Sequence, residues 1–127
     1  ADVARAHCDF VSESLLNWVE GVAREDEPLP QLQRLIQALL GDPARRKLHA
    51  VLFAEGCLDD LTLRAILETS LEQWTVMFEV GALKLCLPQT RELSAHAALF
   101  FTLLGGYMLK TNVTQEDMRE LAALMAG

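Results

Sequence analysis

The sequence predicts an all-α domain of about six helices, packed as an antiparallel bundle. Apolar residues recur along most of the chain at the three- and four-residue spacing of amphipathic helices. Gly, Pro and short polar clusters divide this pattern into segments joined by short loops. No stretch alternates apolar and polar residues between turn signals, as a half-buried strand would. Helices that follow one another through short loops are therefore expected to pack side by side.

The first two predicted helices are amphipathic. Val3 to Ala23 carries one apolar stripe over its whole length. Leu29 to Leu40 is shorter, with Pro30 suited to its first turn and Gly41 suited to its end. The segment 24–28, with four charged residues followed by a proline, breaks the pattern and predicts a surface connection.

A third helix is predicted from Pro43 to about Glu55, ending at Gly56. Asp42 is a good N-cap for it, and Pro43 is a good first helical residue. The residues expected to face the core are Leu48, Val51 and Leu52, with His49 and Phe53 as further candidates.

A long fourth helix is predicted to begin after Asp59 or Asp60 and to run to about Leu83. Either aspartate can cap it and complement the positive end of the helix dipole. One apolar stripe runs along it, and we expect this stripe to form the main wall of the core: Leu63, Ile66, Leu67, Ser70, Leu71, Trp74, Met77, Phe78 and Gly81.

The fifth predicted helix, Glu92 to Leu109, is unusually apolar. A loop at residues 87–89 precedes it, and Thr90 is the expected cap. Between Leu93 and Leu109 there is no Asp, Glu, Lys or Arg. A last short helix is predicted after a capping-box-like start at residues 114–117.

The fifth helix has two different apolar sides. At about 100° per residue, large side chains crowd one side, and small residues line the other. A stripe of small residues lets another backbone approach closely, so we expect this domain to pair. The alternative is a helix buried on all sides within one chain. A membrane span is not expected, because the apolar run is shorter than the roughly 20 residues that a span needs.

Composition narrows the class of protein. The chain has 127 residues, enough for one domain, and three scattered cysteines that suggest neither a disulfide framework nor a zinc site. A reducing, cytoplasmic setting fits best. The net charge of −7 argues against nucleic acid as a direct partner. Arg45, Arg46 and Lys47 form the only dense basic group and are expected to be a solvated helix turn.

No catalytic constellation or metal-binding spacing is visible. His7, His49 and His96 are scattered, and no motif supports a cofactor, a metal or an enzyme. Glu92 and His96 are four residues apart, which is more typical of a helix-stabilising pair than of a catalytic dyad. Large and adaptable side chains offer an apolar ligand pocket, the alternative being a filled core; the candidates are Phe53, Trp74, Met77, Phe78, Phe100, Phe101 and Tyr107.

The order of the segments is itself informative. A short helix ends near Gly41-Asp42-Pro43, and the long helix LRAILETSLEQWTVMFEVGALK follows. After the Leu87-Pro88 linker come ELSAHAALFFTLLGGYML, with small residues before a large apolar end, and the closing helix TQEDMRELAALMAG. From Leu29 to the C-terminus this order resembles the ligand-binding and dimerisation domain of TetR-family transcriptional repressors.

The resemblance implies a homodimer whose last two helices pack with their mates as a four-helix bundle, and a small apolar effector bound among the central helices. Residues 1–25 would be the connector from an N-terminal helix-turn-helix, a motif that this sequence does not contain. DNA would then be bound only through that part of a longer chain. The dimer candidates are Ala95, Ala98, Thr102, Gly105, Leu109, Leu121 and Leu124.

Two other classes remain open at this stage. A stand-alone helical protein–protein interaction module would have an exposed apolar groove and no enclosed cavity. An all-α enzyme or haem protein would have polar groups that converge in a cleft.

Overall fold

The computed structural model describes residues 2–58, 60–87 and 91–127, and within them the chain forms α-helices and no strand. The all-α prediction is therefore confirmed. The expected capping roles of Asp59 and Thr90 lie outside the described residues. The helices are α1 (Asp2–Gly21), α2 (Pro28–Leu40), α3 (Pro43–Gly56), α4 (Leu61–Lys84), α5 (Leu93–Met108) and α6 (Gln115–Ala126).

Several helix starts form as the sequence predicts. The carboxylate of Asp42 accepts a backbone N–H of the first turn of α3 at 2.9 Å, and Asp60 does the same for α4 at 2.9 Å. At the start of α6, Thr114 Oγ1 accepts the Asp117 N–H at 3.1 Å, and Asp117 Oδ2 accepts the Thr114 N–H at 3.0 Å. This capping box satisfies two N–H groups that a helix leaves unpaired.

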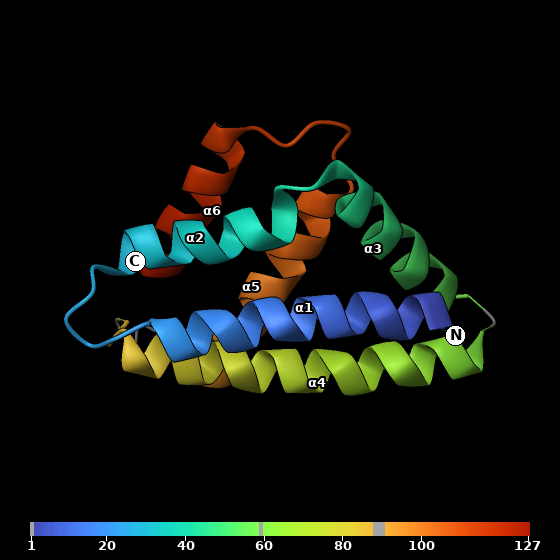
Figure 1. Ribbon diagram of the computed structural model, residues 1–127, viewed down its shortest axis with the longest axis horizontal. Coiled ribbons are helices and arrows are strands. Elements are labelled where there is room, and N and C mark those ends of the chain that lie inside the picture. The colour runs from blue at the N-terminus through green and yellow to red at the C-terminus, as the bar shows by residue number, and fades with distance from the viewer. Residues whose placement is uncertain (1, 59, 88–90) are drawn as a thin grey trace.

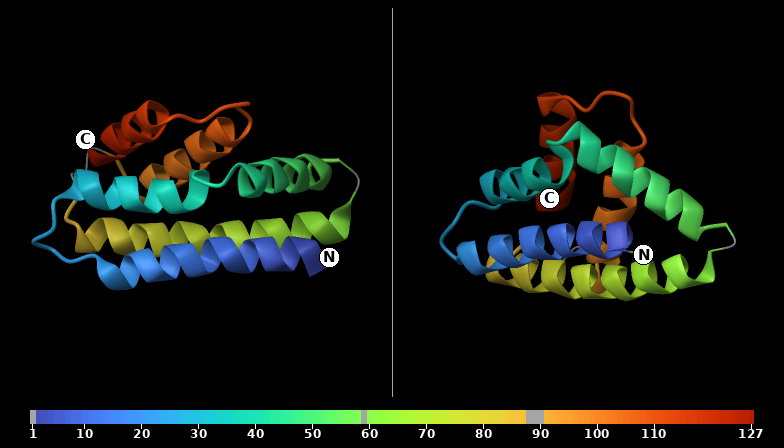
Figure 2. Two further views of the ribbon diagram at one scale, coloured as in Figure 1. Left: turned by 45° about the horizontal axis from the view of Figure 1, so that its top comes forward. Right: turned by 45° about the vertical axis from the view of Figure 1, so that its right-hand side comes forward.

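The longest helices, α1 and α4, lie side by side and run parallel (Figures 1 and 2). Trp74 Nε1 donates to Ser12 Oγ at 3.0 Å, and further along both helices Lys84 donates to the Val19 carbonyl. The antiparallel expectation came from short loops between consecutive helices. It does not apply to this pair, because α2 and α3 return the chain to its starting end between them (Figure 1).

The contact between α1 and α4 depends on a glycine, Gly81, which has no side chain. The buried ring of Trp18 lies against Gly81, where a Cβ atom would come within 2.1 Å of Trp18 Cζ3. Trp18 Nε1 donates to the Gln31 carbonyl of α2 at 2.8 Å. Phe78 stacks on Trp18 at 5.8 Å between ring centroids and on Phe100 of α5 at 4.4 Å. We call this closely packed contact the α1–α4 seam.

Above the α1–α4 pair, α5 rises obliquely towards the start of α3, and α6 packs on α2 (Figures 1 and 2). His96 joins α5 to α6, since its Nε2 donates to the Met125 carbonyl at 3.0 Å. Its Nδ1 lies 2.8 Å from the guanidinium of Arg91. The neighbour of His96 is thus Arg91, and the predicted contact with Glu92 is replaced.

Two sequence predictions for α3 are wrong. Val51 is 44% exposed rather than buried, because it lies on a side of α3 that the contacts with α1, α2, α4 and α5 leave uncovered. Arg46 is 7% exposed rather than solvated, because its guanidinium donates to the Leu40 carbonyl at the end of α2. A carbonyl at a helix end lacks an intrahelical donor, so this contact completes α2. Among the described residues, no helix is both long and apolar enough to cross a membrane.

Candidate functional site

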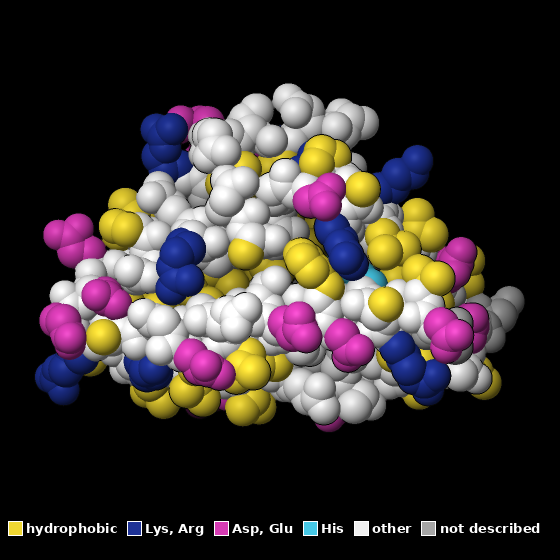
Figure 3. Space-filling view, viewed as in Figure 1, with side chains coloured by type: hydrophobic (Ala, Val, Ile, Leu, Met, Phe, Trp, Pro, Cys, Tyr) yellow, Lys and Arg dark blue, Asp and Glu magenta, His cyan; other side chains and the backbone are white. Residues whose placement is uncertain are grey.

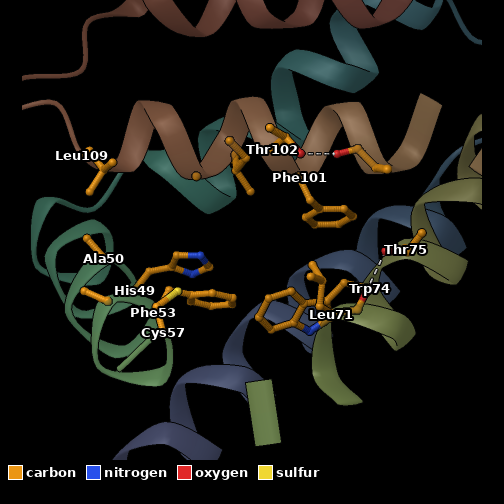
Figure 4. A pocket seen from close by; sticks show the side chains of 14 residues that line it. His49, Ala50, Phe53, Cys57, Leu71, Trp74, Thr75, Phe101, Thr102 and Leu109 are labelled. Atoms are coloured by element: carbon orange, nitrogen blue, oxygen red, sulfur yellow. Dashed lines mark hydrogen bonds between the residues drawn. The ribbon is translucent and has the colours of Figure 1, made fainter. Parts of the chain in front are cut away.

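An apolar groove of about 520 Å³ lies between α3, α4 and α5. Figure 4 shows side chains of the three helices facing a common space, with α5 forming one side and α3 and α4 the other. The residues that line it are His49, Ala50, Phe53, Ala54, Cys57, Leu71, Trp74, Thr75, Ala98, Phe101, Thr102, Leu104, Gly105 and Leu109.

Aromatic rings form much of the groove wall. Phe53 stacks on His49 with ring centroids 4.3 Å apart, and Trp74 lies 6.2 Å from Phe53. Phe101 of α5 lies 6.2 Å from Trp74 on the other side of the space. These three aromatic residues were all predicted from the sequence as ligand-binding residues, and the fold brings them together.

The side of α5 that carries small residues, which we call the small stripe, lines the same groove. Ala98, Thr102, Gly105 and Leu109 were predicted as a dimer surface, and all four line the space opposite α3 and α4. A Cβ atom at Gly105 would meet no atom within 4 Å. The predicted pairing surface and the predicted ligand site therefore share one wall.

Most polar groups of the groove are already hydrogen-bonded. The Thr75 hydroxyl donates to the Leu71 carbonyl at 2.7 Å, and the Thr102 hydroxyl donates to the Ala98 carbonyl at 2.8 Å (Figure 4). The Trp74 N–H is taken by Ser12 of α1. None of the described lining residues is Asp, Glu, Lys or Arg. The groove is thus suited to an apolar molecule.

His49 is the histidine among the groove residues that the sequence predicted neither as ligand-binding nor as dimer residues; the others are Ala50, Ala54, Cys57, Leu71, Thr75 and Leu104. It lies four residues before Phe53 on α3, so the same helical face carries both, and this spacing was the available signal. A hydrogen bond of 2.9 Å joins its Nδ1 to His7 Nε2 of α1. Burial lowers the pKa of His7 to about 4 and that of His49 to about 3, and the positive charge of Arg45 lowers the pKa of His7 further. Both rings are therefore neutral at pH 7.

Four predicted ligand-binding residues do not line the groove. Phe78 and Phe100 are fully buried because they stack on each other in the core. Met77 faces a second shallow hollow between α1 and α4, together with Leu16. Tyr107 is half-buried elsewhere on α5, with the ammonium of Lys110 5.8 Å from its ring centroid.

The other predicted dimer residues differ in exposure. Ala95 lies exposed on α5, and Leu124 of α6 is 57% exposed. The prediction that Leu121 lies in a dimer interface is wrong. Leu121 is fully buried in the core of the same chain, where α6 packs on α2, so it is not a surface residue. The large apolar side of α6 is therefore directed inward.

Acidic side chains border the hollow between α1 and α4. Glu13 and Glu72 flank its apolar floor, which includes Leu16 and Val76. On the face of the molecule seen in Figure 3, acidic side chains lie over the middle and apolar side chains along the lower edge. No polar group of this hollow is buried and unpaired among the described residues, so it offers less for specific recognition than the groove.

Comparison with known proteins adds no assignment. No family model, curated protein or solved structure matches this chain. Among the residues that the structure describes, no three His, Cys, Asp or Glu side chains are grouped to hold a metal ion. Proposals about function therefore rest on the geometry of the groove.

Proposed function

We propose that this chain is the effector-binding and dimerisation part of a regulator similar to the TetR family, and that the groove between α3, α4 and α5 takes a small, largely apolar molecule. The observation that supports this best is the groove itself, with Phe53, Trp74 and Phe101 around about 520 Å³ of space. Ligand sites of this size are mostly apolar, with few polar groups. DNA binding would belong to a part that precedes α1.

The shared wall of α5 connects the two proposed activities. A second copy packed on Ala98, Thr102 and Gly105 would cover the open side of the groove. A ligand in the groove would then lie beside the partner, and ligand and partner would each change the other's affinity by the same factor. In a longer regulator this coupling would alter the spacing of the DNA-binding parts at the start of each α1.

Ligand binding can be tested with hexylbenzene as an uncharged apolar probe. In a Trp18→Phe variant the remaining tryptophan is Trp74, which lines the groove, so its fluorescence reports occupancy. Gly105→Phe should abolish binding by placing a ring in the groove, since a Cβ atom at this position meets no atom within 4 Å. Gly106→Phe is the matched control, since Gly106 is equally unobstructed but does not line the groove. Equal binding by both variants would remove the groove as the ligand site.

Pairing can be tested by light scattering over a concentration series. Leu109→Glu should weaken the dimer, because Leu109 is 73% exposed at the end of the small stripe. Leu61→Glu is a matched control, 70% exposed on α4 and outside the proposed interface. A chain that is monomeric at all concentrations, with and without probe, would refute the dimerisation part of the proposal.

One observation favours the alternative, an interaction module for another protein. The groove is open to solvent beside Leu71 and Leu109, both exposed leucines. An amphipathic helix of a partner would fit an apolar groove of this kind. A strict monomer that binds no small probe would make this alternative the preferred function.

A further inference from the structure

His49 is the buried polar residue of the groove that has an unfilled hydrogen-bonding position. The residue is 7% exposed, and its Nδ1 is paired with His7. Its Nε2 has no hydrogen-bond partner among the described residues. The ring projects from α3 into the space opposite Phe101 and Trp74 (Figure 4).

The hydrogen bond between the two histidines has two possible directions. If His7 Nε2–H donates, the buried His7 Nδ1, which lacks a partner, is an unpaired acceptor, and His49 carries its proton on Nε2. If His49 Nδ1–H donates, His7 Nδ1 carries a proton and becomes an unpaired buried donor. Among backbone groups, unpaired buried donors are rarer than unpaired acceptors. We infer that the imidazole nitrogens follow the same preference, which favours the first direction, with His7 as donor.

We infer that the groove recognises an uncharged, largely apolar molecule with a carbonyl oxygen, which accepts a hydrogen bond from His49 Nε2–H. His7 acts as a positioning residue, because its own N–H occupies His49 Nδ1 and so keeps the His49 proton on Nε2. This inference rests on the proposed ligand groove and adds the chemical class of the ligand.

The absence of charge in the groove excludes ionised ligands from this class. The described lining residues include no cation and no anion, and the His49 ring is neutral at pH 7 because burial, and then the neighbouring His7, lower its pKa to about 3. A carboxylate ligand would lose its hydration without gaining a counter-ion. A ketone or ester loses less hydration free energy on burial, and one hydrogen-bond donor is enough to pair its carbonyl oxygen.

The direction of the histidine pair can be measured without any ligand. Ring nitrogen NMR at pH 7 distinguishes a protonated nitrogen from an unprotonated one. We expect His49 to show a protonated Nε2 and an unprotonated Nδ1. The opposite assignment would overturn the inference and would leave the proposed ligand groove untouched.

Ligand class can be measured with three probes of similar shape: hexanophenone, hexylbenzene and para-hexylbenzoate. A groove that selects only by hydrophobicity prefers hexylbenzene. With a hydrogen bond from His49 we expect hexanophenone to bind about fivefold more tightly than hexylbenzene, and para-hexylbenzoate to bind most weakly. His49→Phe should remove the preference for hexanophenone and leave hexylbenzene affinity within about twofold.

His7 is tested by rescue. His7→Leu should reduce the preference for hexanophenone, since His49 Nδ1 then has no donor and the proton is free to move to it. His7→Gln should restore the preference, because its amide N–H can donate to Nδ1. If neither His7 variant alters the preference, the positioning role is refuted.

The outcomes separate the two proposals. Binding of hexylbenzene and hexanophenone in order of hydrophobicity, unaffected by His49→Phe, would keep the groove and refute the carbonyl recognition. Tightest binding of para-hexylbenzoate would also refute it. If none of the three probes binds, the proposed function itself fails, and carbonyl recognition falls with it.

Discussion

The two sides of α4 show how differently one helix can be packed. At Gly81 it faces α1, and the ring of Trp18 occupies the space that a side chain would need. Towards α3 and α5 it presents Leu71 and Trp74, and about 520 Å³ is left open. The difference lies in the facing side chains: α1 brings the Trp18 ring against a glycine, whereas α5 faces the groove with Ala98, Thr102 and Gly105 as well as with Phe101. A large side chain packed against a glycine closes the contact between two helices. Small side chains that face a more distant helix leave a groove.

Among single substitutions, the largest change in stability is expected from adding a methyl group to the α1–α4 seam. Gly81→Ala places a methyl group within 2.9 Å of three Trp18 ring atoms, and the buried ring has no free space to enter. We expect a loss of about 3 kcal/mol in the free energy of unfolding, at the upper end for overpacked cores. Urea denaturation measures it. No loss, or a gain like that expected for an exposed Gly→Ala change in a helix, would show that the seam is loosely packed.

Acid should weaken the groove wall before it weakens the seam. The pKa of His7 is lowered to about 4 and that of His49 to about 3, below the ordinary value of 6.5 that both rings regain on unfolding. The unfolded chain therefore binds more protons below pH 6.5, so stability present above that pH is lost as the pH falls towards 4. On these pKa values each of the two rings contributes a loss of about 2 kcal/mol between pH 7 and pH 5.

Denaturation at the two pH values measures this loss. A variant with His7→Leu and His49→Phe should have a flatter pH dependence in the same range. An equally steep dependence in that variant would mean that other groups, and not the histidine pair, carry the effect.

A smaller effect is expected at the hydrogen bond that joins the seam to the groove. Ser12→Ala removes the acceptor of the Trp74 indole N–H, which is 3.0 Å away. A buried donor left unpaired costs about 1 kcal/mol. The free energy of unfolding should fall by that amount, and Trp74 fluorescence should change. Unaltered fluorescence would show that Trp74 keeps its position without Ser12.

The smallest effect should be a gain on the open side. Gly105→Ala adds a methyl group that meets no atom within 4 Å, and alanine favours a helix more than glycine does. We expect the chain to be stabilised by at most about 1 kcal/mol. Opposite effects of Gly105→Ala and Gly81→Ala on the free energy of unfolding would support the difference in packing between the two sides of α4. Destabilisation by Gly105→Ala would indicate that something covers this part of α5, such as a second copy.

Sequence periodicity predicted most of the helical framework. The caps at Asp42 and Asp60 and the capping box at Thr114 depend on contacts within a few residues, so local sequence is enough to specify them. Most of the apolar stripe of α4 was predicted for the same reason, but Leu71 is 36% exposed beside the groove and is not part of the core wall. Periodicity failed at Val51 and Arg46, because burial there depends on how much of α3 other helices cover.

The candidate site was only partly predictable. Phe53, Trp74 and Phe101 were chosen as large residues on buried stripes, but Phe78 and Phe100 satisfied the same criterion and fill the core instead. A helical wheel gives the side of a helix on which a residue lies. It does not give the distance to the next helix, and that distance separates a packed ring from one that lines a groove.

The sequence by itself determined the six helices, their caps and the two unlike sides of α5, because these depend on residue type and spacing along one helix. Only the tertiary structure decided that α1 and α4 run parallel, that Leu121 is buried and that His7 meets His49 across 42 residues of sequence. The physical reason is that such contacts arise from the relative placement of helices, which short-range periodicity does not encode.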